Sequence, residues 1–560
     1  MDFEKLANLI YPNVKYTNEE LEKKYPERTL PKESYVTRFA PSPTGYLHIG
    51  NFFSVFMDWQ IARMSNGIFY FRLEDTDKKR EISGSGFVAL NILKEFGIVP
   101  NEGLMPDGTS IGNYGPYVQS QRLDIYHTYA KELIKSGKAF PCFCQKTQSI
   151  EEIRQKRQEQ LESEEDIIEK DPCRNLTYAE IEQNIKDKKP FAIRLKSQGE
   201  KENKILVSDL IRGERELAQN SKDVILVKND GIPPYAFAHA VDDHLMRTRL
   251  VIRGEEWFVS MPAHVEIFDA LGFEHVKYIH TPIICKIDEQ TGNKRKLSKR
   301  KDPEADMRFF LSQGYPKLAV LEYLLTLANS NYEIWKLQNP NLSFLKFPFS
   351  IEKIGNSNPM FDLLKLSDIA KNIIGKMSAE EVYENLLIYT KEFDNEFYET
   401  LLKDKNYAIK VLSIDRNIDK PRKDFAKWCD FKQFFSYMFG FSSFNKKTDY
   451  NLENVKENNI ENVLNAYKKI YNSADDKETW FNKIKQLSGE LGFATDNKLY
   501  KSNPQDYCGN VADVCNYVRI ALTGKQNSPD IHNIAQILGD EEVKNRLENL
   551  EKFVKKVNLW

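Results

Sequence analysis

Residues 35–73 read YVTRFAPSPTGYLHIGNFFSVFMDWQIARMSNGIFYFRL, and this stretch decides the fold. The apolar run 35–40 predicts a strand, PSPTG predicts a turn, and residues 48–66 carry apolar side chains at helical spacing. Gly67 predicts the end of that helix, and residues 68–73 predict a second strand. This order of elements indicates a parallel sheet that binds its ligands at the carboxyl ends of the strands.

Outward from this stretch the pattern continues and is then interrupted. Residues 81–96 and 120–137 predict two further helices, each closed by a glycine. The charged run EEIRQKRQEQLESEEDIIEKD, residues 151–171, is rich in helix formers and indicates an inserted domain. Strand-like stretches at 224–227 and 250–252 indicate that the first sheet resumes after the insertion.

The two ends of the chain differ from its middle. Residues 1–34 are polar and punctuated by proline, and we interpret them as an extension that carries no chemistry. Beyond residue 375, helical patterns alternate with Asn- and Lys-rich stretches such as FNKKTDYNLENVKENN, which are typical of exposed loops. A chain of 560 residues is too long for one hydrophobic core, so we predict a multi-domain α/β protein with an all-α C-terminal region.

The composition excludes several classes of protein. Hydrophobic residues make up 41% and charged residues 29%, which is ordinary for a globular protein and not typical of disorder. No apolar run approaches the ~20 residues of a membrane span, and the N-terminus lacks the basic start of a secretory signal. Seven cysteines form an odd and sparse set, which favours a reducing compartment. We therefore expect a cytoplasmic protein that does not contact membranes, and a monomer.

The segment RFAPSPTGYLHIGN, from Arg38 to Asn51, is the most specific motif. A tight turn delivers His48 and Gly50 to the start of a helix, where free N–H groups and the positive end of the helix dipole favour phosphate. His48 can donate a hydrogen bond to a phosphate oxygen, and Gly50 lets a flat base approach the backbone. HIG by itself is also compatible with an ordinary turn.

With these residues the sequence resembles the class I aminoacyl-tRNA synthetases, whose first signature begins His-Ile-Gly. Their second signature is a mobile lysine loop, and KLSKR at residues 296–300 is similar to it. The resemblance implies ATP with Mg²⁺ as substrate, bound by His48, Gly50, Asn51, Trp257 and Lys299. His48, Gly50, Lys296 and Lys299 would be the catalytic set, because positioned charges stabilise a phosphate as negative charge develops.

RFAPSPTG followed by FRLEDTD at residues 71–77 resembles the glutamyl branch of these enzymes, whereas the glutaminyl branch has a Pro-Glu-Pro-Asn turn. The resemblance implies that L-glutamate is the amino acid. Its side-chain carboxylate would be bound by Arg38, Tyr235 and Arg253, and its amino group by Ser42 and Glu74. A guanidinium can hold a carboxylate with two charge-assisted hydrogen bonds, although a structural ion pair is the commoner role of an arginine.

Two neighbouring segments extend this site. In YAFAHAVDDHLM, His239 stands where the family has asparagine, and a neutral histidine can still donate one hydrogen bond to glutamate. VIRGEEWFVSMPAH, residues 251–264, again resembles the family and implies that Trp257 lies near the adenosine. A core tryptophan is the alternative for that residue.

The C-terminal segment, residues 518–547, resembles the terminal helices of bacterial-type glutamyl-tRNA synthetases. The resemblance implies that glutamate is joined to the 3′ end of tRNA(Glu) through a glutamyl-adenylate, and that activation needs bound tRNA. Charging of tRNA(Gln) is left open. The implied domains are an N-terminal extension (1–34), a Rossmann-like catalytic domain in two halves (35–119 and 223–288), an inserted acceptor-binding domain (120–222), a stem-contact domain with the KLSKR loop (289–375) and a helical anticodon-binding domain (376–560).

Cys142, Cys144 and Cys173 resemble the zinc site that some family members carry in the inserted domain, and thiolates suit zinc. A fourth ligand is not evident, because Asn175 stands where a histidine is expected. Glu169 or Asp171 would have to replace it. We therefore expect the inserted domain to fold without tightly bound zinc, with three free cysteines as the alternative.

Two other functions fit part of this pattern. A small nucleotidyltransferase shares the HIG-type turn, but it does not need the helical region after residue 375. A catalytically inactive tRNA-binding protein is a second alternative, against which the intact His48, Gly50, Lys296 and Lys299 argue.

Overall fold

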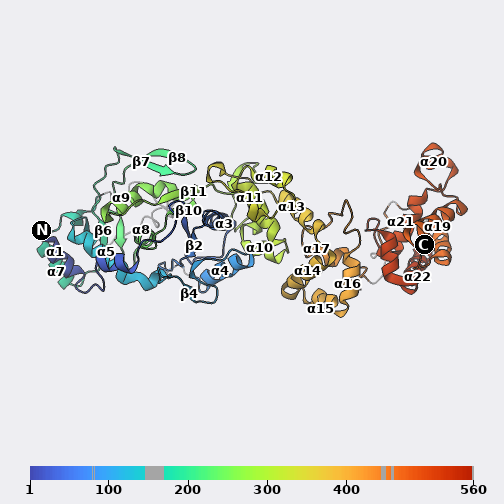
Figure 1. Cartoon of the computed structure of the whole chain (residues 1–560), viewed down its shortest axis with the longest axis horizontal. Helices are drawn as coiled ribbons and strands as arrows, with labels where there is room; N and C mark the ends of the chain where they lie inside the picture. Colours follow the sequence, from blue (N-terminus) through green and yellow to red (C-terminus); the bar gives the residue numbers. More distant parts are fainter. Residues whose placement is uncertain are drawn as a thin grey trace. The chain divides into compact units, whose positions relative to one another are not determined.

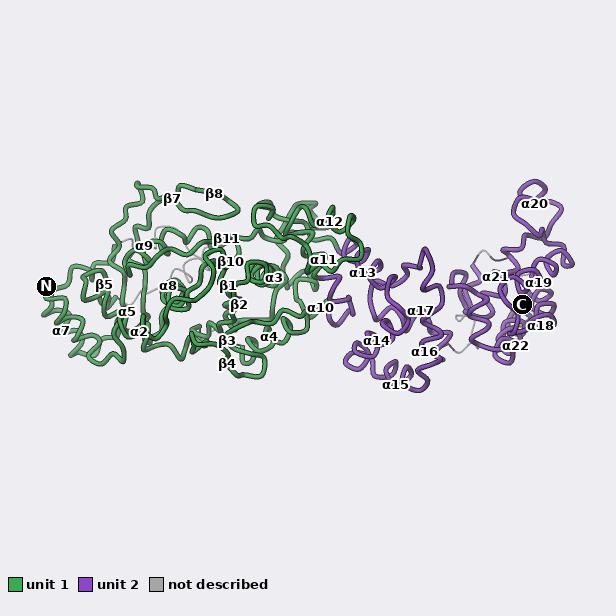
Figure 2. The backbone as a smooth tube through the Cα atoms, in the orientation of Figure 1, with its two compact units in different colours: residues 1–310, 321–362 green, residues 311–320, 363–560 purple. Residues whose placement is uncertain are grey.

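The computed structural model describes residues 1–77, 80, 82–144, 170–442, 450–453, 455 and 459–557. The chain forms two compact units, one of residues 1–310 with 321–362 and one of residues 311–320 with 363–560 (Figure 2). The finer domain boundaries inferred from the sequence remain predictions.

A parallel sheet organises the first unit (Figure 1). β2 pairs in parallel with β1 and β3, β4 joins β3 in the antiparallel direction, and β10 pairs in parallel with β11. β10 lies beside β1, where the N–H of Arg249 donates to the C=O of Val36 over 3.0 Å. The elements are β1 (Val36–Phe39), α3 (Ile49–Met64), β2 (Ile68–Phe71), α4 (Ser85–Glu95), β3 (Glu102–Leu104), β4 (Ser110–Ile111), α8 (Tyr235–Leu245), β10 (Leu250–Gly254), α9 (Met261–Leu271) and β11 (Lys277–Thr281). The predicted α/β fold is confirmed.

α3 connects β1 to β2 as the sequence predicts. His48 caps its start in an extended conformation, and α3 packs against β1, β2 and β10 with an almost wholly buried surface. The chain leaves the helix at Gly67, where an added Cβ would lie 1.8 Å from the backbone oxygen of Tyr35. Only glycine allows this close return into β2.

The inserted segment builds its own antiparallel sheet in the order β5-β6-β9, together with a β7–β8 hairpin. Its elements are α5 (Leu123–Lys135), β5 (Ala139–Cys142), α7 (Tyr178–Lys186), β6 (Ala192–Leu195), β7 (Lys204–Asp209), β8 (Gly213–Ala218) and β9 (Ile225–Val227). The prediction that residues 224–227 rejoin the first sheet is wrong, because β9 pairs with β6. An apolar strand can be buried in either sheet, and its periodicity does not identify the strand with which it pairs. Most of the charged run 151–171 lies outside the described residues.

Residues 1–34 contain two helices, α1 (Phe3–Ile10) and α2 (Asn18–Lys24), that the sequence analysis did not predict. Asp2 caps α1, and Thr17 with Glu20 forms a capping box for α2. α1 packs on α5, and Arg28 forms a bidentate ion pair with Glu102 at 2.8 and 3.0 Å. The extension is therefore an integral layer of the first unit.

The sheet is followed by a hairpin of β12 (Cys285–Ile287) and β13 (Lys294–Lys296), and then by α10 (Met307–Ser312), α11 (Lys317–Ala328) and α12 (Tyr332–Gln338). The described residues of the second unit form helices joined by loops, without a named strand among them, around one hydrophobic core. Its helices are α13 (Leu363–Lys376), α14 (Ala379–Phe393), α15 (Asn395–Lys403), α16 (Lys405–Leu412), α17 (Asp430–Phe434), α18 (Ile460–Ile470), α19 (Lys477–Glu490), α20 (Asn497–Ser502), α21 (Val511–Thr523) and α22 (Ile531–Val557). The predicted all-α region is confirmed; of the predicted loop 444–459, residues 444–449, 454 and 456–458 lie outside the described residues. Among the described helices, none is long and apolar enough to cross a membrane.

Candidate active site

A cleft opens at the carboxyl ends of the strands, where α3 begins. His48, Gly50 and Asn51 line one wall, and Lys296 from β13 lines another. The remaining lining residues are Ser54, Gly254, Glu256, Thr281, Pro282, Ile283 and Ile284. The cleft thus joins the start of a helix with a lysine, which is an arrangement suited to phosphate.

His48 is neutral in this setting. Its Nδ1 accepts a hydrogen bond from the N–H of Gly50 over 2.9 Å, so the ring proton is on Nε2. Burial, together with the positive charges of Lys299 and Lys296, lowers the pKa of His48 to about 4. His48 is therefore a hydrogen-bond donor through Nε2 at neutral pH, and not a cation.

The KLSKR segment begins at Lys296, the last residue of β13, and acidic side chains bind the chain around this point. Arg295 binds Asp302 through two hydrogen bonds of 2.6 and 2.8 Å, and these bonds lower the pKa of Asp302 to about 2. Asp302 also accepts from the N–H of Ser298. Beyond this anchor, Lys299 is exposed and its ammonium donates to the backbone C=O of Tyr46, in the turn before α3.

Arg38 and Arg253 are brought together at the same edge of the sheet. Each is the penultimate residue of its strand, Arg38 in β1 and Arg253 in β10. Arg38 is 3% exposed and uses its Nε to bind Asp243 at 3.2 Å. No described group is bonded to the two Nη atoms of Arg38 in this structure.

Arg253 is 6% exposed and is surrounded by neutral groups. Its Nε donates to Nε2 of His280 over 3.0 Å, and its Nη1 lies 3.2 Å from the hydroxyl of Tyr235 and 3.1 Å from Nδ1 of His264. Its Nη2 lies 3.1 Å from the sulfur of Met261. Among the described residues no carboxylate pairs with Arg253, so this buried cation has no counter-ion.

Tyr235 begins α8 and lies beside Arg253. Its ring stacks on that of His239 with a 5° interplanar angle, and Trp257 lies 4.5 Å away, centroid to centroid. Trp257 is not among the residues that line the cleft, whereas its neighbours Gly254 and Glu256 are. Its contact with the adenosine therefore stays a prediction.

His239 is fully buried, and both of its ring nitrogens face protein groups. Nδ1 lies 2.5 Å from a carboxylate oxygen of Asp243, and Nε2 lies 3.0 Å from the hydroxyl of Tyr278. Burial lowers the pKa of His239 to about 4, so the ring is neutral, with its proton on the nitrogen that faces Asp243. Both ring nitrogens thus face protein oxygens, and the hydrogen bond of His239 to glutamate stays a prediction.

Glu74 lies beside the turn that contains Ser42, because its N–H donates to the C=O of Pro41. Ser42 is exposed in that turn. Arg72 binds the Glu74 carboxylate at 2.8 Å, and burial raises the pKa of Glu74 to about 7. Glu74 is thus a buried acid next to the pocket.

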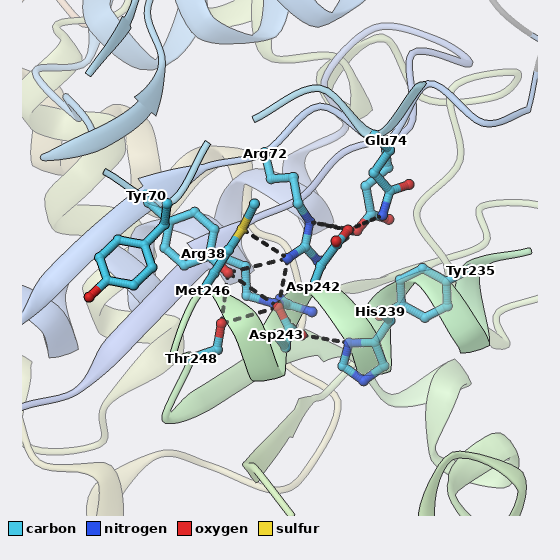
Figure 3. A network of polar contacts seen from close by, with 12 residues as sticks. Arg38, Tyr70, Arg72, Glu74, Tyr235, His239, Asp242, Asp243, Met246 and Thr248 are labelled. Carbon is cyan, nitrogen blue, oxygen red and sulfur yellow. Dashed lines mark hydrogen bonds and ion pairs between the residues drawn. The ribbon is translucent and has the colours of Figure 1, made fainter. Parts of the chain in front are cut away.

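A buried ionic network supports this wall of the pocket, and sequence reasoning missed it (Figure 3). Asp243 on α8 binds Arg72 at 2.8 Å and Arg38 at 3.2 Å, while its neighbour Asp242 binds Arg122 at 2.6 Å. All of these side chains are at most 4% exposed. Two adjacent acids within an otherwise apolar helix, HAVDDHL, were the signal in the sequence.

The three cysteines of the inserted segment lie together with Asp171. The sulfur of Cys144 is 3.4 Å from that of Cys173, and an Asp171 oxygen is 3.0 Å from the sulfur of Cys142. The four donor atoms lie within 4.8 Å of one another, which suits a tetrahedral zinc site. Asp171, one of the two residues that could replace the expected histidine, thus lies with the three cysteines, and Glu169 lies outside the described residues.

Comparison with known proteins gives a consistent result. The family described as "tRNA synthetases class I (E and Q), catalytic domain" matches residues 34–344, and "Anticodon binding domain" matches residues 509–550. The glutamate–tRNA ligases of Clostridium perfringens and Acetivibrio thermocellus are each 42% identical, over 98% of this chain and 100% of theirs. A crystal structure of a glutamate tRNA ligase from Elizabethkingia meningosepticum in complex with its amino acid has the same fold, with a TM-score of 0.71, 24% identity, and coverage of 93% of this chain and 100% of that one.

Proposed function

The chain belongs to the glutamate–tRNA ligase family of class I tRNA synthetases, and from this we propose that it forms glutamyl-adenylate from L-glutamate and ATP and transfers the glutamyl group to the 3′ end of tRNA(Glu). The α-carboxylate of glutamate attacks the α-phosphate of ATP, and pyrophosphate leaves. A ribose hydroxyl at the 3′ end of the tRNA then takes the acyl group and AMP leaves. No side chain forms a covalent intermediate.

One observation carries the choice of glutamate, namely the absence of a counter-ion for Arg253 among the described residues. A buried cation without a partner is costly, so the site is built for a ligand that supplies a carboxylate. Arg38 faces the same edge with its Nη atoms available, and Tyr235 can add a hydroxyl. Arg38, Arg253 and Tyr235 would bind the side-chain carboxylate, and Glu74 with Ser42 would bind the amino group.

The cleft at the start of α3 is the proposed ATP site. His48, Gly50 and Asn51 would contact the nucleotide, Lys296 and Lys299 would neutralise charge on the phosphates, and catalysis would come from positioning and electrostatic stabilisation. Among the described residues that line the cleft, Glu256 is the only carboxylate, which is too few for a magnesium cage made by protein alone. The Mg²⁺ would therefore be held mainly by the phosphates of ATP.

The inserted segment and the helical second unit are the proposed partners of the tRNA, at its acceptor end and its anticodon. The experiment that tests the whole proposal is aminoacylation by the purified protein with labelled amino acid and two purified tRNAs. Glutamate should be attached to tRNA(Glu), and glutamine to neither tRNA. Attachment of glutamate to tRNA(Gln) in the same assay decides whether the enzyme is non-discriminating. We expect pyrophosphate exchange to need bound tRNA, so full exchange without tRNA would refute that part.

Cys142, Cys144, Cys173 and Asp171 would hold a zinc ion, which would stabilise the fold of the inserted segment. The donor set fits, because three thiols and one carboxylate converge within one zinc-sized site. Asp171 also has a role without metal, since its side chain accepts from the N–H of Cys173 and caps the short helix that follows.

A further inference from the structure

We propose that Asp209 and His280 are positioning residues, which orient Arg253 for the side-chain carboxylate of glutamate. The proposal rests on the function proposed above and adds two residues to it. Asp209 ends β7 in the hairpin of the inserted segment, His280 lies in β11, and Arg253 lies in the adjacent strand β10. Three distant parts of the sequence thus meet behind the pocket.

The contacts form a continuous chain through fully buried atoms. An oxygen of Asp209 lies 2.8 Å from Nδ1 of His280, and Nε2 of the same ring accepts from Nε of Arg253 over 3.0 Å. The same Asp209 oxygen accepts from the backbone N–H of His280 at 2.8 Å. Asp209 is 2% exposed and His280 is 0% exposed, so water does not compete for these bonds.

Only one protonation state of His280 satisfies both neighbours. A carboxylate can only accept, so the proton of the ring must be on Nδ1, and the Nε–H of an arginine can only donate, so Nε2 must carry a lone pair. Burial lowers the pKa of His280 to about 4, and the charge of Arg253 acts in the same direction, so the ring stays neutral. Asp209 therefore fixes the tautomer that Arg253 requires.

The bond from His280 decides which edge of Arg253 faces the substrate. The Nε edge is occupied inside the protein, and the Nη atoms are left with neutral partners, the hydroxyl of Tyr235 and the sulfur of Met261 among them. A carboxylate can then approach only the Nη side of the guanidinium. Without His280, Nε of Arg253 would lose its one bond to a described residue, and the fork would be less firmly aimed in advance.

The hairpin that carries Asp209 is itself fixed to the strands. The second oxygen of Asp209 accepts from the N–H groups of Ile211 and Arg212, both over 2.9 Å. Arg212 donates to the backbone C=O of His280 over 3.2 Å and forms an ion pair with Glu255. The turn of the hairpin therefore contacts both Asp209 and His280, the first two members of the relay Asp209–His280–Arg253.

Two substitutions at the same position separate a positioning role from a structural one. His280→Asn can keep a donor toward Asp209 but is too short to reach Arg253. His280→Gln can place an amide oxygen near the position of Nε2, and so retains an acceptor for Arg253. We expect His280→Asn to raise the KM for glutamate by about 10-fold or more, with a KM for ATP changed by less than about threefold. His280→Gln should recover most of the loss.

Asp209→Asn tests the other end of the relay. Both oxygens of Asp209 accept from N–H groups, so the amide nitrogen of asparagine would face a donor in either orientation. Where that nitrogen faces His280, it would also favour the opposite tautomer of the ring. The KM for glutamate should rise in Asp209→Asn as it does in His280→Asn. The double variant should have a KM close to that of His280→Asn alone, because both substitutions act through the bond between His280 and Arg253. The matched control is Asp269→Asn, which breaks an exposed Asp269–His275 pair of 2.7 Å and should leave the KM for glutamate unchanged.

A second measurement does not depend on activity. Nitrogen NMR of the wild-type protein labelled at histidine should show that Nδ1 of His280 is protonated and Nε2 is not. The His280 signal is assigned by its loss in His280→Gln. The opposite tautomer would overturn the relay. Equal effects of His280→Asn on glutamate and ATP, or an unchanged KM for glutamate, would also overturn it. Failure of the wild type to charge tRNA with glutamate would instead reject the proposed function and leave the NMR result standing.

Discussion

Arg38 and Arg253 occupy the penultimate positions of two neighbouring strands, β1 and β10, so their guanidinium groups emerge at one edge of the sheet. The two groups differ in what holds them. Arg38 is anchored by a carboxylate, Asp243, whereas the bonds of Arg253 to described residues are all to neutral groups. The charge of Arg38 is therefore compensated by Asp243, and the charge of Arg253 is not compensated by a described residue. One uncompensated positive charge is what a ligand with a single side-chain carboxylate requires.

Replacing Lys299→Ala should lower the rate of glutamate activation by roughly 10² or more, because one charge that stabilises the transferring phosphate is lost. Affinity for tRNA should stay nearly the same. Lys301→Ala is the matched control, since Lys301 belongs to the same exposed segment but is paired with Asp288 at 3.7 Å. Pyrophosphate exchange in the presence of tRNA measures both variants, and an unchanged rate for Lys299→Ala would remove Lys299 from the catalytic set.

Protonation of His239 should weaken the first unit as the pH falls. His239 has a pKa of about 4 in the folded protein, below the ordinary value of about 6.5, so the unfolded chain binds more protons between these two pH values. Stability is therefore lost as pH falls from about 6.5 toward 4. Between pH 7 and pH 5 this one group should cost about 1 to 2 kcal/mol.

His239→Asn removes that titration and can keep a donor toward Asp243. The melting temperature of the variant should fall less between pH 7 and pH 5 than that of the wild type, as measured by scanning calorimetry. An equal fall in both proteins would show that His239 is not buried in its neutral form.

The cysteine cluster should retain about one zinc per chain through purification, because structural zinc is bound tightly when all of its ligands converge. Elemental analysis measures the metal directly. Asp171→Asn should reduce the zinc content, and Cys142→Ser should abolish it, whereas Cys429→Ser in the second unit should leave it unchanged. A metal-free wild-type protein would mean that Asp171 acts only as the cap of the helix that follows it.

Local signals in the sequence predicted the local parts of the fold. The turn before α3, the helix itself and its end at Gly67 depend on residues that are close along the chain, and each was predicted within a few residues of its position. α1 and α2 are not predicted although Asp2 and the Thr17–Glu20 pair are ordinary capping signals, because the prolines and polar residues around them are equally typical of an extended segment.

The parts that could not be predicted depend on long-range contacts. The choice of β6 as the partner of β9 follows from packing, which strand periodicity does not encode. Asp209 and His280 are 71 residues apart, and neither belongs to a motif that suggested a role. Arg38 and Arg253 were identified only through the resemblance to a family. Their shared position at one edge of the sheet is a finding of the structure.

The central claim is that Arg253 recognises the charge of the glutamate side chain, and the kinetics of Arg253→Ala with glutamate and glutamine test it most directly. The wild type should prefer glutamate by about 10³ or more, since a neutral amide leaves the buried cation unpaired. The variant should show a raised KM for glutamate, a nearly unchanged KM for ATP and a narrower gap between the two amino acids, with Arg253→Lys intermediate. Wild-type kinetics for glutamate combined with lost ATP binding would contradict this account and assign Arg253 to the nucleotide site.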